Sequence, residues 1–190
     1  MKPTRITGRI WVLTTPAGEL YDDIDTDMIF HNRYLAITDV AQMGQYTLDN
    51  LKGWQDFAKR AQPGDIVLAG VNFGAGSSRQ QAVDCFRALG IGAIVAESFG
   101  AIYKRNAINS GFPIVSFPRL SDLYTRFKDG DQVEIDFVTG QLVLNGAQVF
   151  QAEPLAKMLR AAAWSMATPS TLIGDVWEKG MMRNPQKSTE

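Results

Sequence analysis

The sequence has one cysteine, Cys85, and one histidine, His31, among its 190 residues. A single cysteine excludes an intrachain disulfide, a cysteine-based zinc site and a cysteine-ligated iron–sulfur cluster held by this chain alone. Serine–histidine–aspartate catalysis would depend on His31, and no Gly-x-Ser-x-Gly motif accompanies it. We therefore expect His31 to be structural or exposed. Cys85 lies on the apolar stripe of a predicted helix and is expected in the core.

Long apolar runs and an excess of one charge are missing as well. No apolar run approaches the length that spans a bilayer, and the first 15 residues contain no signal-peptide core. Lysine and arginine number 19 against 20 aspartates and glutamates, a net charge of −1, which argues against a nucleic-acid partner. With 45% apolar residues, the composition is that of a globular domain. We expect a cytoplasmic protein that binds neither membrane nor nucleic acid.

The order of predicted elements favours an α/β fold. Apolar, β-branched segments predict strands at 5–14, 66–73, 92–99 and 112–117. Apolar residues at helical spacing predict helices at 48–60, 78–89 and 101–111. The middle of the chain therefore has the order β-α-β-α-β, which is typical of parallel strands with helical crossovers. Towards the C-terminus the patterns predict a hairpin over 131–146 and a helix over 153–167. We expect one domain over 1–167 and a C-terminal extension over 168–190.

A glycine-rich junction follows the second predicted strand, in the stretch "GVNFGAGSSRQQA". Gly74 and Gly76 allow positive φ angles and a close approach of a ligand to the backbone. Ser77 and Ser78 are expected at the N-cap and in the first turn of the next helix, where free N–H groups and the helix dipole favour an anion. Arg79 adds a planar cation that can hold a carboxylate through two hydrogen bonds. The same residues are also compatible with a plain helix cap and a solvated arginine.

A dinucleotide-binding loop is the alternative for this junction. A Gly-x-Gly pair follows a strand, and Glu97 ends the next strand about 20 residues later, where a ribose-binding acid would stand. The third glycine of that motif would fall at position 79, where the chain has Arg79. A P-loop is excluded because no Gly-Lys-Ser/Thr is present.

Three segments together resemble the small subunits of isopropylmalate dehydratase and homoaconitase, which correspond to the swivelling domain of aconitase. They are "DDIDTDMIFHNRYL", "GDIVLAGVNFGAGSSRQQA" and "IVAESFGAIYKRNAINSGFPIV", and the resemblance runs from about residue 6 to 117. It implies a three-layer β/β/α swivelling domain around a mostly parallel central sheet. It also implies a hydro-lyase that is active only with a large subunit, which carries a [4Fe–4S] cluster. This chain would bind no cofactor or metal of its own.

The resemblance also assigns roles to individual residues. Ser77 would be the general base, and Asp27 a second catalytic residue in the acidic turn of "DDIDTD". Asp25 in the same turn has either a site role or a local structural one. The residues implied to bind a substrate carboxylate are Arg33, Gly76, Ser78 and Arg79. Asn106 and Asn109 fall in a family-like segment, where side-chain amides more often cap a helix end.

The segment after the first site arginine bears on the substrate. In these enzymes that place is thought to select the variable substituent, and here it holds the apolar residues Leu35, Ala36 and Ile37. An apolar pocket suits an alkyl group better than a third carboxylate. The resemblance therefore implies conversion of 2-isopropylmalate to 3-isopropylmalate in leucine biosynthesis. Dimethylmalate, citramalate and homoaconitate are alternatives, as is a non-catalytic carboxylate-binding domain. The chain departs from the family at Gln80 and Gln81, where a glutamate and a histidine are usual.

Overall fold

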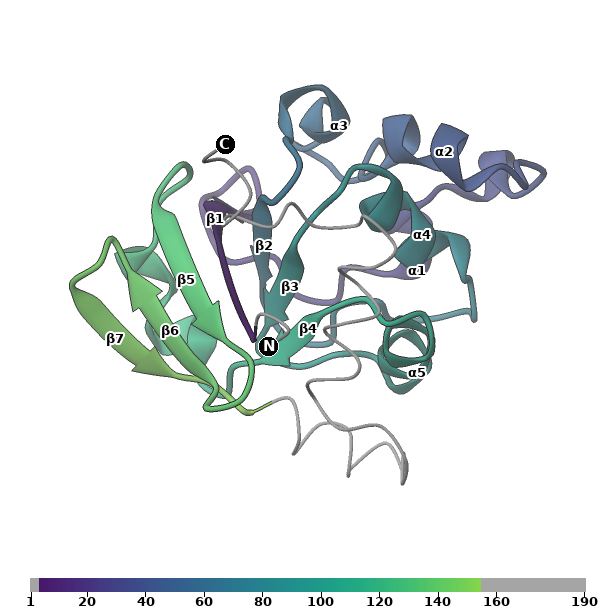
Figure 1. Cartoon of the computed structure of the whole chain (residues 1–190). Coiled ribbons are helices and arrows are strands. Elements are labelled where there is room, and N and C mark those ends of the chain that lie inside the picture. The colour runs from purple at the N-terminus through teal and green to yellow at the C-terminus, as the bar shows by residue number, and fades with distance from the viewer. Residues whose placement is uncertain (1–3, 155–190) are drawn as a thin grey trace, which may run out of the picture.

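The structure is a computed structural model that describes residues 4–154 (Figure 1). A seven-stranded sheet has the order β4-β3-β2-β1-β5-β6-β7. The strands are β1 (Arg5–Val12), β2 (Ile66–Ala69), β3 (Ala93–Ala96), β4 (Ile114–Ser116), β5 (Gln132–Asp136), β6 (Gln141–Leu144) and β7 (Gln148–Gln151). Most of the predicted helix over 153–167 and the whole predicted extension over 168–190 lie outside the described residues.

Most of the helices are short. The α-helices are α1 (Thr26–Ile29), α2 (Val40–Met43), α3 (Phe57–Arg60), α4 (Gln81–Ala88) and α5 (Ala101–Asn109). The 3₁₀ turns are η1 (Asn32–Tyr34), η2 (Gly44–Tyr46), η3 (Leu120–Asp122) and η4 (Tyr124–Arg126). Within residues 4–154, no helix has the length and apolar character needed to cross a membrane.

The predicted β-α-β-α-β unit is confirmed. Strands β1, β2, β3 and β4 pair in parallel, and every residue of β2 and β3 is buried. Helices α4 and α5 are the crossovers from β2 to β3 and from β3 to β4. The strand order advances in one direction, so right-handed crossovers place both helices on the same face of the sheet (Figure 1).

The other half of the sheet is antiparallel. β5 and β6 form the predicted hairpin around Gly140, whose φ of +75° suits the turn, and β7 adds a strand that the sequence did not predict. Three of the six strand pairs are therefore parallel and three antiparallel, so the predicted α/β class is confirmed and the sheet is mixed. β1 joins the halves: Arg5–Arg9 pair with β5, and Ile10–Val12 pair with β2.

The predicted helix over 48–60 is wrong for most of its length. Only α3 is helical, and turns precede it. Leu48 has a φ of +61° and Gly53 a φ of +89°, and neither conformation belongs to a right-handed helix. Leu51, Trp54 and Phe57 are nevertheless buried, so the apolar spacing marks a core-facing segment.

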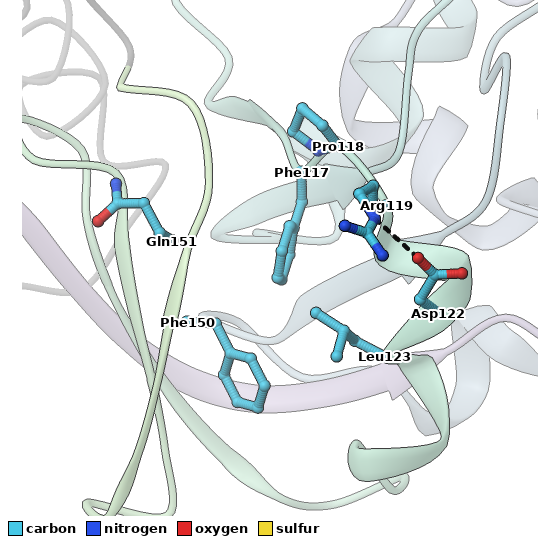
Figure 2. Close-up of a pocket in the computed structure, with 7 residues that line it drawn as sticks. All are labelled: Phe117, Pro118, Arg119, Asp122, Leu123, Phe150 and Gln151. Atoms are coloured by element: carbon cyan, nitrogen blue, oxygen red, sulfur yellow. Dashed lines mark hydrogen bonds and ion pairs between the residues drawn. The ribbon is translucent and has the colours of Figure 1, made fainter.

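A pocket of about 300 Å³ lies between η3 and β7 (Figure 2). Its lining is mostly apolar, with an Arg119–Asp122 ion pair beside it at 2.8 Å. The lining residues are Phe117, Pro118, Arg119, Asp122, Leu123, Phe150 and Gln151. None of them is a predicted site residue.

Candidate active site

Backbone pairing brings together the acidic turn (residues 22–27) and the glycine loop (residues 74–79), which are some 50 positions apart in the chain. The Thr26 amide donates to the Ala75 carbonyl at 2.9 Å. The Thr26 hydroxyl donates to the Ser77 carbonyl at 3.1 Å. The two segments thus fix each other beyond the carboxyl end of β2, the usual place for a ligand site in a parallel sheet.

The prediction that the glycine loop leads directly into a helix is wrong. Helix α4 begins only at Gln81, and its N-cap residue, Gln80, makes no side-chain capping bond. Ser77 and Ser78 are therefore not in the N-cap and first-turn positions expected of them. Gly76, with a φ of +88°, is not helical, and the first turn of the helix is closed by the Ala82 and Asp84 amides, which donate to the carbonyls of Arg79 and Gln80. The Arg79 side chain meanwhile reaches back to the α1 segment. This spacing also departs from a dinucleotide-binding loop, in which the glycines open the helix.

The three residues that end the loop nevertheless offer donors to an anion. Within residues 4–154, the amide N–H groups of Ser77, Ser78 and Arg79 donate to no protein group, and the two serine hydroxyls have no partner. Both serines are exposed, and Gly76 bends the backbone with a φ of +88°. Successive free N–H groups in a turn form an anion-binding concavity without help from a helix dipole.

Beneath the loop lies a buried tyrosine. The Tyr103 ring is 1% exposed and meets the Phe73 ring edge-on at a centroid distance of 5.3 Å. The Gly74 backbone, with a φ of +78°, lies against this ring so closely that a Cβ at Gly74 would overlap it. Glycine is therefore required at this position both by the φ angle and by the close approach.

Arg79 and Asp27 form the central ion pair of the site. The Arg79 Nη1 lies 2.6 Å from the Asp27 Oδ1 and also donates to the Phe30 carbonyl at 3.2 Å. The hydrogen bond from Arg79 lowers the pKa of Asp27, and the Asn32 amide, which donates to the same carboxylate, lowers it further. Asp27 is therefore a hydrogen-bond acceptor that fixes the Arg79 guanidinium, and it is ionised at neutral pH.

This pair predicts acid-sensitive stability. A folded-state pKa of Asp27 below its unfolded value gives stability that is fully present above about pH 4 and is lost as the pH falls through the folded value. Asp27→Asn should lower the free energy of unfolding at pH 7 by about 1 kcal/mol, because solvent screens a pair with a carboxylate one-third exposed. Urea unfolding at pH 7 and pH 3 measures this, and the two proteins should converge at the lower pH.

The matched control is Asp56→Asn, which removes a carboxylate that is 60% exposed and paired with Arg60 at 3.2 Å. It should change the free energy of unfolding little at either pH. An Asp27→Asn effect that stays constant between pH 7 and pH 3 would contradict the prediction.

Arg33 forms a second ion pair, with Asp49, the residue before a partner of Asp27. Its Nη2 donates to the Asp49 Oδ2 at 3.1 Å, and its guanidinium lies 4.6 Å above the centre of the Tyr34 ring. Asn50, the next residue after Asp49, donates to the Asp27 Oδ2 at 3.2 Å. The sequence did not point to Asp49 or Asn50, because their contacts depend on the turns after α2.

Asp25, His31 and Cys85 have contacts that stabilise the local structure. Asp25 is the N-cap of α1 and accepts hydrogen bonds from the amides of Asp27 and Met28, which is the local structural role foreseen as one alternative. The His31 Nδ1 accepts from the Arg33 amide at 3.1 Å and so caps the turn that carries Arg33. Cys85 is fully buried, and this burial raises its pKa to about 12, as a core residue requires.

The predicted specificity segment is mostly open to solvent. Leu35 is 38% exposed, Ala36 is exposed, and Ile37 packs partly against the core. Asn106 accepts a hydrogen bond from the Ser110 hydroxyl through its backbone carbonyl, and the expected amide caps are absent among residues 4–154. No three His, Cys, Asp or Glu side chains of these residues gather closely enough to hold a metal ion.

Comparisons with known proteins agree with this architecture. The family model for the aconitase C-terminal domain matches residues 22–120. The 3-isopropylmalate dehydratase small subunit of Sulfurisphaera tokodaii is 40% identical over 137 residues, 72% of this chain and 79% of that protein. The small subunit of the same name from Caldicellulosiruptor saccharolyticus is 39% identical over 167 residues, 85% of this chain and 94% of that protein.

A solved structure also matches. The crystal structure of 3-isopropylmalate dehydratase from Methanocaldococcus jannaschii superposes with a TM-score of 0.69 at 31% sequence identity, covering 93% of this chain and 98% of that one. The family match spans the acidic turn, the glycine loop and both crossover helices. The chain therefore belongs to the aconitase C-terminal domain family and, within it, to the 3-isopropylmalate dehydratase small subunits.

Proposed function

We propose that this chain is the small subunit of a cytoplasmic hydro-lyase that converts 2-isopropylmalate to 3-isopropylmalate in leucine biosynthesis. The relatives of that name support the reaction class. The observation that carries the proposal is the glycine loop. Beside the fixed Arg79 it presents two serine hydroxyls and three amide N–H groups that have no partner among residues 4–154. A small dicarboxylate is the ligand that such a set of donors suits best.

In this proposal Ser77 moves the proton. Its Oγ, as the alkoxide, takes a proton from the carbon next to a substrate carboxylate, the electrons of that C–H bond form the C=C bond, and the hydroxyl on the adjacent carbon leaves with its bonding pair as hydroxide. The proton now on Ser77 and the released hydroxide together make up one molecule of water. Water then adds back across the double bond with the two positions exchanged. A serine is a very weak base unless its alkoxide is stabilised, and the free loop amides with the Arg79 guanidinium are placed to stabilise it.

The remaining residues bind and orient the substrate. Ser78, Gly76 and Arg79 would hold the carboxylate next to the reacting carbon, and Arg33 the second one. Asp27 serves by fixing Arg79, since its lowered pKa makes it a poor proton acceptor near pH 7. Leu35, Ala36 and Ile37 would meet the alkyl substituent.

The leaving hydroxyl needs a Lewis acid, and the resemblance implies a [4Fe–4S] cluster in the large subunit. Among residues 4–154 no donor set fits such a group, and the one cysteine of the chain is buried. When bound in the large subunit, the cluster supplies an iron site that withdraws electrons from the leaving oxygen. The site is then complete only when both subunits are together.

Exposed apolar side chains around the site suit a protein partner. Val71 follows β2 and is 38% exposed; Ile102 stands at the start of α5 and is 44% exposed. Leu35 and Val40, 38% and 39% exposed, belong to the segment after Arg33. These four are most of the exposed large apolar residues in the described part of the chain. Val71 accepts a hydrogen bond from the Asp23 amide of the acidic turn at 2.8 Å, Ile102 precedes Tyr103, and Leu35 and Val40 follow Arg33, so all four lie on segments that carry or adjoin the site.

Ile102→Asp is therefore expected to weaken assembly with the large subunit by about 100-fold or more, because the contact would bury an unpaired charge. The free subunit should keep its stability, since Ile102 is exposed. Size-exclusion chromatography or calorimetric titration of the two subunits measures the change.

Val149→Asp is the matched control. Val149 is 59% exposed on β7, at the opposite edge of the sheet from α5 (Figure 1). The Val149→Asp variant should bind the large subunit as tightly as the unsubstituted protein does. Equal weakening by both substitutions would argue against an interface centred on the site.

The function is tested by co-expressing this chain with a candidate large subunit under anaerobic conditions. Formation of the C=C bond is followed by ultraviolet absorbance with isopropylmalate, dimethylmalate, citramalate and homocitrate. Turnover of isopropylmalate that requires both chains is the expected result. If only another of these substrates is turned over, the chain is the small subunit of a related dehydratase. If the two chains do not assemble, a non-catalytic carboxylate-binding domain is favoured.

A further inference from the structure

The Asp49 carboxylate is hydrogen bonded to two side chains that lie 15 and 16 positions earlier in the sequence. One carboxylate oxygen, Oδ2, accepts from the Tyr34 hydroxyl at 2.6 Å and from the Arg33 guanidinium at 3.1 Å. The other oxygen, Oδ1, is buried and has no hydrogen-bond partner among residues 4–154. A buried unpaired carboxylate oxygen is unfavourable for stability. The only hydrogen-bond partners of this carboxylate among residues 4–154 are therefore Arg33 and Tyr34.

The backbone before Asp49 holds it rigidly in this place. Leu48 is fully buried in a left-handed conformation, with a φ of +61°, and its amide donates to the Ile29 carbonyl at 2.9 Å. A left-handed leucine costs about 1–2 kcal/mol, and such strain persists only where the surroundings fix it. The turn therefore directs Asp49 towards Arg33 with little freedom.

The Tyr34 ring completes a platform for the arginine. It stacks on the Tyr46 ring with a centroid distance of 3.9 Å, and the Arg33 guanidinium carbon lies over the Tyr34 ring, 4.6 Å from its centroid. Arg33 is thus held by a carboxylate at one nitrogen and by an aromatic face. Its side chain remains 59% exposed, and Nη2 is the only guanidinium nitrogen with a hydrogen bond to a residue in the described range.

We propose that Asp49 is a positioning residue that, together with the Tyr34 platform, orients Arg33 so that its free N–H groups face one carboxylate of the substrate. The inference rests on the proposed function, in which Arg33 binds a substrate carboxylate. Asp49 does not touch the substrate in this arrangement. It fixes the direction of the guanidinium before the substrate arrives, which lowers the ordering cost of binding.

Asp49→Asn in the assembled enzyme should raise KM about tenfold while kcat changes by less than about twofold, because ground-state and transition-state binding weaken together. Asp49→Glu should recover part of the loss, since it restores the charge. The matched control is Asp122→Asn, which breaks the same kind of pair with Arg119 beside the pocket of Figure 2 and should leave KM unchanged. An unchanged KM for Asp49→Asn in an active enzyme overturns the proposal.

A second measurement does not depend on turnover. The hydrogen bond to Asp49 raises the pKa of the Tyr34 phenol, with burial and the Asp49 charge adding to it, so Asp49→Asn should lower that pKa. Tyrosine-labelled NMR titration of the free subunit measures it, and Tyr34→Phe identifies the signal. A Tyr34 pKa that does not move overturns the proposal. An inactive unsubstituted complex together with a lowered pKa would count against the proposed function while supporting the Asp49 arrangement.

Discussion

Ser77→Ala is expected to lower kcat of the assembled enzyme by about 10²–10⁴-fold, the usual contribution of a positioned general base. The fold should not change, because the Ser77 side chain is exposed and its hydroxyl has no partner within residues 4–154. Substrate affinity should also change little, since the loop amides and Arg79 remain. Initial rates and substrate binding of the complex, measured side by side, separate the two effects.

Ser121→Ala is the control for this substitution. Ser121 is an exposed serine in η3, outside the proposed site. Its backbone amide donates to the Glu97 carboxylate at 2.7 Å, and its hydroxyl has no hydrogen-bond partner among residues 4–154. The variant should retain full activity. If Ser77→Ala retains activity within about threefold of the unsubstituted enzyme, Ser77 is not the base, and a loop that only binds a carboxylate becomes the better account.

Gly74→Ala should have the largest effect on stability. The new methyl group would overlap the buried Tyr103 ring, and alanine would adopt a φ of +78°. Left-handed strain of about 1–2 kcal/mol and overpacking of about 1–3 kcal/mol together predict a loss of about 2–5 kcal/mol. For a chain of this size that corresponds to a melting temperature lower by about 10 °C. Thermal unfolding followed by circular dichroism measures it.

Gly130→Ala separates the two causes. Gly130 has a φ of +92°, but a Cβ there would meet nothing within 4 Å. Only the backbone strain should appear, at about 1–2 kcal/mol. Equal losses for Gly74→Ala and Gly130→Ala would show that the contact with Tyr103 contributes nothing.

The sequence predicted the parallel half of the fold well, because its strands are short runs that are buried on both faces. It failed over residues 48–60, and the reason is physical. The Leu51, Trp54 and Phe57 amides each donate to the residue three positions earlier, so successive turns bring apolar side chains inward with nearly the period of a helix. Spacing alone does not distinguish the two.

The sequence indicated some of the residues that meet in the candidate site, whose roles stay predictions. Ser77, Ser78 and Arg79 stood out because they follow a strand and two glycines, and the structure pairs Arg79 with the predicted Asp27. Asp49 had no signal of its own, since its partner Arg33 lies 16 positions away and meets it only through tertiary folding. The loop amides are free because α4 begins only at Gln81. Residue spacing predicted that this helix starts at residue 78, three positions too early.

The strand that joins the two halves of the sheet has a consequence for synthesis on the ribosome. β1 leaves the exit tunnel before the other strands of the sheet, yet Arg5 meets its partner Asp136 across 131 positions of chain. The strands, helices and loops of the site are all synthesised before that partner. We therefore expect the face that carries the candidate site to fold while half of β1 is still unpaired, and the β5–β6 hairpin to complete the sheet last.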